Sequence, residues 1–314
     1  MDGLQIFDCT LRDGGLTNNF FFEDSFVRDL YQANVEAGVA YMEMGYRASR
    51  DIFDEKEFGK WKFCDEEAIR EIVGDHPEHI KLAVMADIGR TDYRRDILPK
   101  KDSVLDMIRI ATYSHTIGEA LDAVEHCHGL GYETTVNIMA VSNDTEETIA
   151  EVLEKLAKSS VDVIYLVDSF GSFYPHQAAH LMEQYAKAAF PKGKRVGIHA
   201  HNNQQLAFAN TIECVKSGAS FLDVTVNGLG RGAGNCAAEL LAGYLMGQGA
   251  DCSEEPFIQF IEKHVLALKK KGVVWGYDIP YLLTGQKNKH PSKAIEFIKE
   301  QRTQYTDFLR ELAG

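Results

Sequence analysis

The sequence lacks any long uninterrupted run of apolar residues. None of its hydrophobic stretches approaches the roughly 18 residues that suggest a membrane-spanning helix. The first ten residues, MDGLQIFDCT, also lack the basic segment and apolar stretch that open a secretory signal. We therefore expect a cytoplasmic protein that does not act at a membrane.

Basic residues and paired cysteines are scarce as well. The chain has 33 Lys and Arg against 47 Asp and Glu, a formal net charge of −14. This argues against nucleic acid as the main partner, because such a partner requires a basic surface. The six cysteines show no CxxC pair, and a chain of 314 residues does not need disulfide staples. We expect reduced thiols.

Short apolar runs alternate with longer amphipathic segments through most of the chain, a pattern typical of parallel βα units. The runs predict strands at 4–8, 40–44, 80–86, 105–111, 133–139, 161–167, 195–200 and 220–226. The segments between them predict helices at 24–37, 65–73, 117–129, 144–158, 175–189 and 204–217. Eight repeats without a linker favour a closed (β/α)₈ TIM barrel. An open doubly wound sheet is the alternative.

The last part of the chain exceeds what closing a barrel requires. Its periodicity predicts helices at about 236–247, 254–271 and 292–312. We expect a catalytic barrel over residues 1–250 and a C-terminal helical extension over 251–314. The extension either packs on the barrel or forms a dimer interface.

The seventh predicted strand ends in HAHNN (199–203), which contains the best candidate metal ligands. Side chains two apart on a strand point to the same face, so His199 and His201 could bind one ion. His126 and His128 have the same spacing but lie in a predicted helix, where residues two apart diverge by about 200°. We expect only the first pair to chelate.

Asp13 and a glycine-rich turn are candidates for completing this site. Asp13 follows the first strand, which is close to the seventh and eighth in a closed barrel, although alone it is typical of a turn residue. Arg12 could neutralise charge on a substrate oxygen, or form a salt bridge at the rim. The turn NGLGRGAGN (227–235) would allow a ligand to approach its backbone, and Asn235 could supply a neutral carbonyl ligand.

Other polar residues follow the predicted strands, where barrel enzymes carry their active sites. Glu43 and Asp168 either hydrogen-bond to the histidines and orient them or cap helices, and the sequence does not distinguish these two roles. The residues that we expect to contact substrate are Asp8, Glu43, Asn137, Asp168 and Gly230.

Taken together, DCTLRDGG (8–15), HAHNN and NGLGRGAGN resemble the signatures of the metal-dependent lyase and synthase barrels that include 3-hydroxy-3-methylglutaryl-CoA lyase. The resemblance covers residues 4–245. It is closest to the 4-hydroxy-2-oxovalerate aldolase branch, through IRIATYSHTIGEA (108–120) and GLGRGAGN. Claisen-type synthases would more typically show Glu-Arg where Arg231 and Gly232 stand.

The resemblance implies a set of roles. Asp13, His199 and His201 would bind a divalent metal, Asn235 would be an additional ligand, and Arg12 would stabilise an enolate oxygen. Mixed oxygen and nitrogen ligands favour Mn²⁺ or Mg²⁺, with Co²⁺ or Zn²⁺ as alternatives.

One position departs from this aldolase branch, which places a basic histidine three residues after the metal-binding aspartate. The residue here is Leu16, which cannot accept a proton. Tyr281 and His290 are our favoured catalytic replacements, because the tail could close over the mouth, and His115 and Glu43 are further candidates. Tyr281 beside a proline, or His290 before one, could equally be structural.

We therefore expect a divalent-metal-dependent aldolase or lyase that acts on a small 2-oxo acid of the 4-hydroxy-2-oxovalerate type through a pyruvate enolate. A Claisen-type enzyme that condenses an acyl-CoA with a 2-oxo acid is one alternative. A non-catalytic barrel that binds metal and a 2-oxo acid is another. The C-terminal tail allows for a homodimer, and the resemblance allows for a companion aldehyde dehydrogenase.

Overall fold

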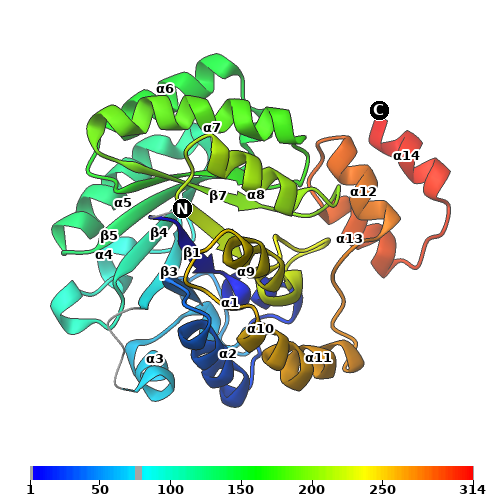
Figure 1. The fold of residues 1–314 in the computed structure, drawn as a ribbon, viewed down its shortest axis with the longest axis horizontal. Helices are drawn as coiled ribbons and strands as arrows, with labels where there is room; N and C mark the ends of the chain where they lie inside the picture. The colour runs from blue at the N-terminus through cyan, green and yellow to red at the C-terminus, as the bar shows by residue number, and fades with distance from the viewer. Residues whose placement is uncertain (1–2, 75–79, 314) are drawn as a thin grey trace.

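The computed structural model describes residues 3–74 and 80–313. Eight parallel strands close into a barrel in chain order, with β8 paired to β1 (Figure 1). The strands are β1 (Gln5–Asp8), β2 (Tyr41–Tyr46), β3 (Lys81–Asp87), β4 (Met107–Thr112), β5 (Glu133–Ile138), β6 (Val163–Asp168), β7 (Arg195–Ala200) and β8 (Phe221–Val224). The predicted TIM barrel is confirmed, and the doubly wound alternative is excluded.

Helices surround the barrel as the amphipathic segments predict (Figure 1). They are α1 (Thr10–Gly14), α2 (Asp24–Glu36), α3 (Glu66–Val73), α4 (Tyr93–Asp96), α5 (Ile117–Gly129), α6 (Glu146–Lys158), α7 (Pro175–Ala189), α8 (Ala207–Lys216) and α9 (Ala238–Gly247). Single 3-10 turns lie at Gly15–Thr17, Lys60–Lys62, Lys100–Asp102, Ser114–Thr116, Val141–Asn143, Phe190–Lys192 and Val226–Gly228.

The strands are buried on both faces, which explains their nearly continuous apolar sequences. One face packs against the helices in the main hydrophobic core. The other fills the barrel with a smaller cluster that includes Phe7, Tyr41, Tyr165 and Phe221. The rings of Phe7 and Tyr41 stack with centroids 5.1 Å apart. The barrel interior is therefore packed with side chains.

The C-terminal extension starts with α10 (Glu255–Phe260), a π-helical turn (Ile261–Val265) and α11 (Leu266–Lys270), and Phe260 of α10 packs edge-on against Phe26 of α2. It continues with α12 (Ile279–Gln286), α13 (Ser292–Lys299) and α14 (Tyr305–Ala313). The prediction of one helix over 292–312 is wrong. The chain turns at Gln301, whose φ of +55° is incompatible with a continuous helix.

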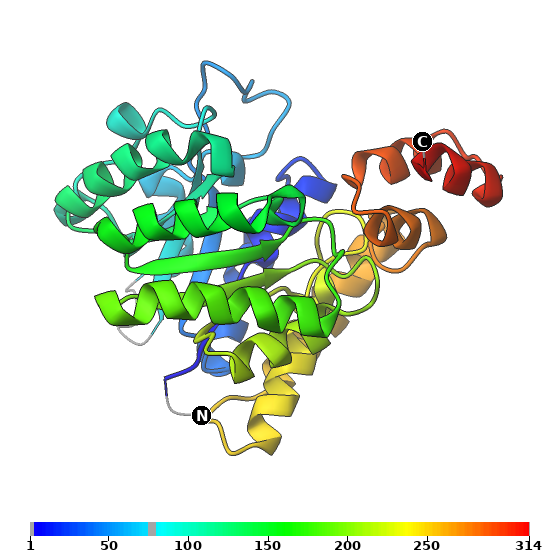
Figure 2. The ribbon, with the colours of Figure 1, turned by 90° about the horizontal axis from the view of Figure 1, so that it is seen from above.

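Helices α12–α14 stand out from the barrel in both views and share a small apolar cluster around Phe297 and Phe308 (Figures 1 and 2). They attach to the loops that follow the strands. The Asn203 side-chain amide donates to the Tyr281 carbonyl at 3.2 Å, and that of Asn288 donates to the Ser142 carbonyl at 2.9 Å. Within the described chain, no helix has the length and apolar character needed to cross a membrane.

Candidate metal centre and active site

Asp13, His199 and His201 come together at the carboxyl end of the barrel. Each is buried, and one potential ligand atom from each lies within 4.8 Å of the others. Asp13 lies in α1 directly after β1, His199 lies on β7, and His201 follows the end of that strand. The two imidazole rings have centroids 5.1 Å apart and planes at 83°. The strand spacing therefore brings the pair to one point, as the sequence predicts.

The donor atoms of this group fit a divalent cation. His199 Nε2 and Asn235 Oδ1 are buried and have no hydrogen-bond partner in the described part of the chain. Burial lowers the pKa of His201 to about 3, so its imidazole is neutral and keeps a free electron pair at pH 7. Burial opposes ionisation of Asp13, but the positive charge of Arg12 holds the pKa of that carboxyl well below its usual range. Metal binding requires these protonation states.

Asn235 and Gly230 pack around Asp13. The Asn235 side-chain amide donates to Asp13 Oδ2, which leaves the orphaned Asn235 Oδ1 as a neutral oxygen beside the carboxylate. A Cβ atom added to Gly230 would lie 2.7 Å from Asp13 Oδ2. Glycine is therefore required here for the turn after β8 to approach the site.

The histidine pair in α5 behaves as the sequence predicts for a helix. The ring of His126 lies against Tyr93, with centroids 5.6 Å apart. His128 Nδ1 instead lies 3.9 Å from a carboxylate oxygen of Asp162. The two side chains have different neighbours and do not converge on one ion.

His199 is oriented by Asp223, which sequence reasoning missed. His199 Nδ1 lies 3.0 Å from Asp223 Oδ2, an arrangement that directs Nε2 away from the carboxylate. Burial would raise the pKa of Asp223, but Arg109 and His199 lower it to about 2. The sequence does contain one signal for this pair, because Asp223 and Arg109 are charged residues inside the apolar strands β8 and β4.

A chain of ion pairs continues from Asp223 to Asp13. Arg109 is fully buried, and its guanidinium donates to Asp223 at 2.6 Å and to Glu43 at 3.0 Å. Glu43 also accepts from Arg12 Nε at 2.8 Å, and Arg12 Nη1 donates to Asp13 at 3.1 Å. Glu43 thus connects the two arginines and does not contact a histidine.

Asp8 and Asp168 hold loops. Asp8 accepts hydrogen bonds from the Thr10 backbone at 3.2 Å and from the Asn34 side chain at 3.0 Å, and burial raises its pKa to about 6. Asp168 accepts from the backbone of Ser172 at 2.8 Å and of Phe173, and burial raises its pKa to about 7. Neither aspartate is among the residues that line the pocket described next.

A cavity of about 80 Å³ opens beside the candidate ligands. It is lined by Arg12, Asp13, Leu16, Tyr46, Met85, Ala111, Asn137, Met139, Val167, Ser169, His199, His201 and Arg231. Asn137 accepts from the Thr135 hydroxyl at 2.8 Å, which leaves its NH₂ group free to donate. The volume suits a unit of a few heavy atoms.

The residues proposed as proton carriers lie at different distances from this cavity. Leu16, at the position where the aldolase branch has its histidine, lines the cavity. Tyr281 packs beside Gly232, and His290 Nε2 lies 3.3 Å from Arg231 Nη1. His115 is exposed and stacks on Tyr113. Neither Tyr281 nor His290 is among the lining residues, so Arg231 stands between His290 and the cavity.

Tyr46 is a lining residue that sequence reasoning missed, although it ends the second strand at the expected face. Within the part of the chain that the structure describes, its hydroxyl makes no hydrogen bond, and burial raises its pKa above the usual value. On the other side of its ring, the Lys62 ammonium lies 4.3 Å from the ring centroid.

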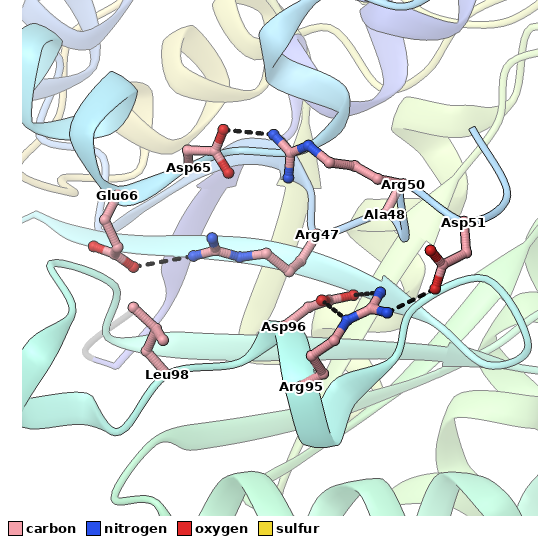
Figure 3. A pocket seen from close by; sticks show the side chains of 9 residues that line it. All are labelled: Arg47, Ala48, Arg50, Asp51, Asp65, Glu66, Arg95, Asp96 and Leu98. Atoms are coloured by element: carbon pink, nitrogen blue, oxygen red, sulfur yellow. Dashed lines mark hydrogen bonds and ion pairs between the residues drawn. The ribbon is translucent and has the colours of Figure 1, made fainter. Parts of the chain in front are cut away.

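A second, more open pocket of about 370 Å³ lies at the rim beside the loops after β2 and β3 (Figure 3). It is lined by Arg47, Ala48, Arg50, Asp51, Asp65, Glu66, Arg95, Asp96 and Leu98. Each arginine faces a carboxylate: Arg47 pairs with Glu66 at 3.0 Å, Arg50 with Asp65 at 2.6 Å and Arg95 with Asp51 at 2.6 Å. The charges of this pocket are therefore already compensated.

The fold and the buried Asp, His, His group define a (β/α)₈ barrel protein with a candidate metal centre. The HMGL-like family model matches residues 3–261, and the chain belongs to this family. The oxaloacetate decarboxylase of Mycobacterium tuberculosis is 30% identical over 78% of this chain and 70% of its own length. The 4-hydroxy-2-oxovalerate aldolase 6 of Rhodococcus jostii is 30% identical over 77% of this chain and 67% of its own. The predicted family and the expected lyase class are confirmed.

Solved structures agree on the fold. The N-terminal domain of a Bacteroides vulgatus protein superposes with a TM-score of 0.82 at 29% identity, covering 94% of this chain and 97% of that domain. The HMG-CoA lyase of Bacillus subtilis superposes with a TM-score of 0.65 over 88% of this chain and 96% of its own. At 15% identity, the second match supports the barrel fold alone.

Proposed function

We propose that this lyase is a divalent-metal-dependent aldolase that cleaves 4-hydroxy-2-oxo acids into pyruvate and a carbonyl compound. The observation that carries the proposal is the convergence of Asp13, His199 and His201 beside a cavity that also contains Arg12. The relatives named for aldolase and decarboxylase activity support it. In this proposal residues 1–250 form the catalytic barrel, and residues 251–314 form a helical extension.

Asp13, His199 and His201 would hold the ion, with Asn235 as an additional oxygen ligand. The ligand set favours Mn²⁺ or Mg²⁺ over Co²⁺ or Zn²⁺. When bound, such an ion supplies Lewis acidity toward the substrate's carbonyl oxygen. Asp223 positions His199 for this role by fixing its ring through Nδ1.

Arg12 would stabilise the negative charge that forms during cleavage. Glu43 and Asp13 fix its guanidinium, which stays charged at every accessible pH. As the bond between C3 and C4 breaks, its electron pair moves toward the oxygen on C2, and a fixed cation there lowers the barrier. Asn137 can donate from its free NH₂ group to the substrate's carboxylate or keto oxygen.

Cleavage also moves two protons, one from the C4 hydroxyl and one to C3 of the pyruvate unit. Leu16 can carry neither, whereas Tyr46 and Ser169, which both have a hydroxyl group, are among the residues that line the cavity. Tyr281 and His290 remain proposals for this step, and they would require the extension to shift toward the cavity. Tyr46 and Ser169 would be proton carriers that need no such shift.

The test is pyruvate release from a panel of 4-hydroxy-2-oxo acids and oxaloacetate, with Mn²⁺ binding measured on the same protein by competition with a chelator. We expect the His199→Ala and His201→Ala variants to lose both metal binding and activity. The control is the double variant His126→Ala/His128→Ala, which should retain both because that pair lies in α5. Metal binding without pyruvate release from any substrate would overturn the proposal and favour a non-catalytic barrel.

A further inference from the structure

Arg231 is a cation at the cavity that has no anionic partner among the residues that the structure describes. It lies in the glycine-rich turn after β8 and lines the cavity. Its Nη2 donates to the Ser169 carbonyl at 3.3 Å, its Nη1 lies 3.3 Å from His290 Nε2, and its Nε is buried without a partner. Among residues 3–74 and 80–313, no carboxylate forms an ion pair with it.

Five other arginines near the carboxyl ends of the strands are compensated by carboxylates. Arg12 and Arg109 each pair with carboxylates inside the barrel. The three arginines of the rim pocket pair in the same way (Figure 3). Asp13 lies in the same lining as Arg231, but its two oxygens are already engaged by Arg12 and Asn235.

The neighbour of Arg231 in the extension adds no negative charge. Burial and the charge of Arg231 both lower the pKa of His290, which favours its neutral ring, and Nδ1 of this ring accepts from the Ser292 backbone N–H at 3.1 Å. Phe170 packs on this histidine with ring centroids 5.8 Å apart. The neutral Ser169 carbonyl thus holds the guanidinium in place, and partial burial of an unpaired charge is costly unless an anion joins it.

We propose that Arg231 binds a second anionic group of the substrate, a carboxylate or phosphate on the fragment beyond C3, and so selects 4-hydroxy-2-oxo acids with an anionic acceptor half. This inference rests on the proposed aldolase function. Arg12 is buried, whereas Arg231 is only partly buried and lies nearer the opening. The deep arginine therefore faces the pyruvate half, and Arg231 faces the half that leaves.

The reaction chemistry agrees with a retained anion. In aldol cleavage the C4 hydroxyl loses its proton, the C3–C4 electron pair moves into the pyruvate enolate, C4 becomes a carbonyl, and C3 is then protonated. An anion attached at C4 or beyond keeps its charge throughout, so Arg231 holds it in the ground state and in the transition state. In decarboxylation of oxaloacetate the C4 carboxylate itself loses its charge, and an arginine bound to it would favour the ground state.

The experiment compares the metal-loaded wild type with Arg231→Gln on matched substrates. One substrate is 4-hydroxy-2-oxopentanoate, which is neutral at its distal end, the second is 4-hydroxy-2-oxoglutarate, and the third carries a distal phosphate. We expect the wild type to prefer an anionic substrate by at least about tenfold in kcat/KM, mainly through KM, since a charge-assisted hydrogen bond contributes about that factor or more. The variant should lose this preference, so that its kcat/KM values for the neutral and the anionic substrates become similar.

Controls separate the role of Arg231 from a fold defect. Arg50→Gln removes a compensated rim arginine and should leave the preference unchanged. Arg231→Lys keeps the charge and should retain part of the preference even if Arg231→Gln folds poorly. The carboxylate and phosphate substrates, compared with each other, identify which anion the site takes.

A binding measurement tests Arg231 independently of turnover. We expect 2-oxoglutarate to bind at least about tenfold more tightly than 2-oxopentanoate, which has the same chain length, and Arg231→Gln to abolish the difference in calorimetric titrations. Pyruvate release with equal kcat/KM for neutral and anionic substrates would overturn the inference but not the aldolase. Absence of pyruvate release would overturn the aldolase, while the binding pair would still decide the role of Arg231.

Discussion

Arg109 is the residue whose replacement tests the ion-pair chain most directly. It is fully buried, and its guanidinium carbon lies 4.2 Å from the Phe7 ring centroid and 4.5 Å from that of Tyr165. Arg109→Met keeps most of this apolar contact but removes the charge that Glu43 and Asp223 share. Breaking a buried pair typically costs about 3–5 kcal/mol, because the remaining carboxylate is buried and unpaired.

Both carboxylates keep one other partner, so we expect a loss of about 3–5 kcal/mol in the free energy of unfolding at pH 7 rather than twice that value. Glu43 retains Arg12, and Asp223 retains His199. The loss should shrink at acid pH. The folded-state pKa of Asp223 is about 2 against a usual 3.8, so its stabilising contribution is complete above about pH 4 and disappears as the pH falls through 2.

Urea unfolding followed by circular dichroism measures this change. The matched control is Arg195→Met, because Arg195 is also on a strand, also stacks on a ring at 4.6 Å and also pairs with a glutamate, but its side chain is 45% exposed. We expect the control to lose less than about 1 kcal/mol. A loss below about 1 kcal/mol for Arg109→Met, or a loss equal to that of the control, would refute the argument from burial.

Three further predictions concern the site and its surroundings. Asp223→Asn should weaken Mn²⁺ binding about tenfold to hundredfold in a chelator competition assay, because His199 loses the carboxylate that orients it; unchanged affinity would contradict this. Leu16→His adds a base to the cavity lining and should raise the rate of pyruvate release at least about tenfold. This rate should increase with pH up to about pH 6.5, where the new histidine loses its proton. No increase would mean that proton transfer does not limit the rate. Burial lowers the pKa of Lys62 from 10.5 to about 8, so the unfolded state binds more protons than the folded state between pH 8 and pH 10.5. The free energy of unfolding should therefore rise by about 3 kcal/mol over that pH range. Urea unfolding of Lys62→Met should show no such rise.

The barrel could be predicted from the sequence because its signal is repeated. Each strand is a short apolar run that is buried on both faces, and each helix shows an apolar stripe, so errors at single boundaries do not change the topology. The helix predicted over 292–312 failed because its apolar spacing continues across the break. The turn at Gln301 depends on a positive φ, for which glutamine gives no warning in the sequence.

The convergence of His199 and His201 could be predicted because strand geometry alone brings the two side chains to one face. The residues that support them could not, since Asp223 meets Arg109 only when β8 and β4 face each other across the barrel, which no spacing along the chain reveals. Strand-end position was also ambiguous. Asp168 and Tyr46 both end a strand, yet Asp168 turns back to bind backbone amides of its own loop, whereas Tyr46 lines the cavity.

The charges at the carboxyl end of the barrel connect the ion-pair chain to the choice of substrate. Asp13, Glu43 and Asp223 carry three negative charges, and Arg12 and Arg109 carry two positive charges, so the chain has one uncompensated negative charge. A divalent cation beside Asp13 would reverse the sign, and Arg231 adds a further positive charge at the same cavity. A 2-oxo acid with one carboxylate would leave one positive charge unbalanced in a site with little solvent. A substrate with two negative charges balances the site. The Arg231→Gln variant has one positive charge fewer, so the substrate charge that it prefers should change from two negative charges to one.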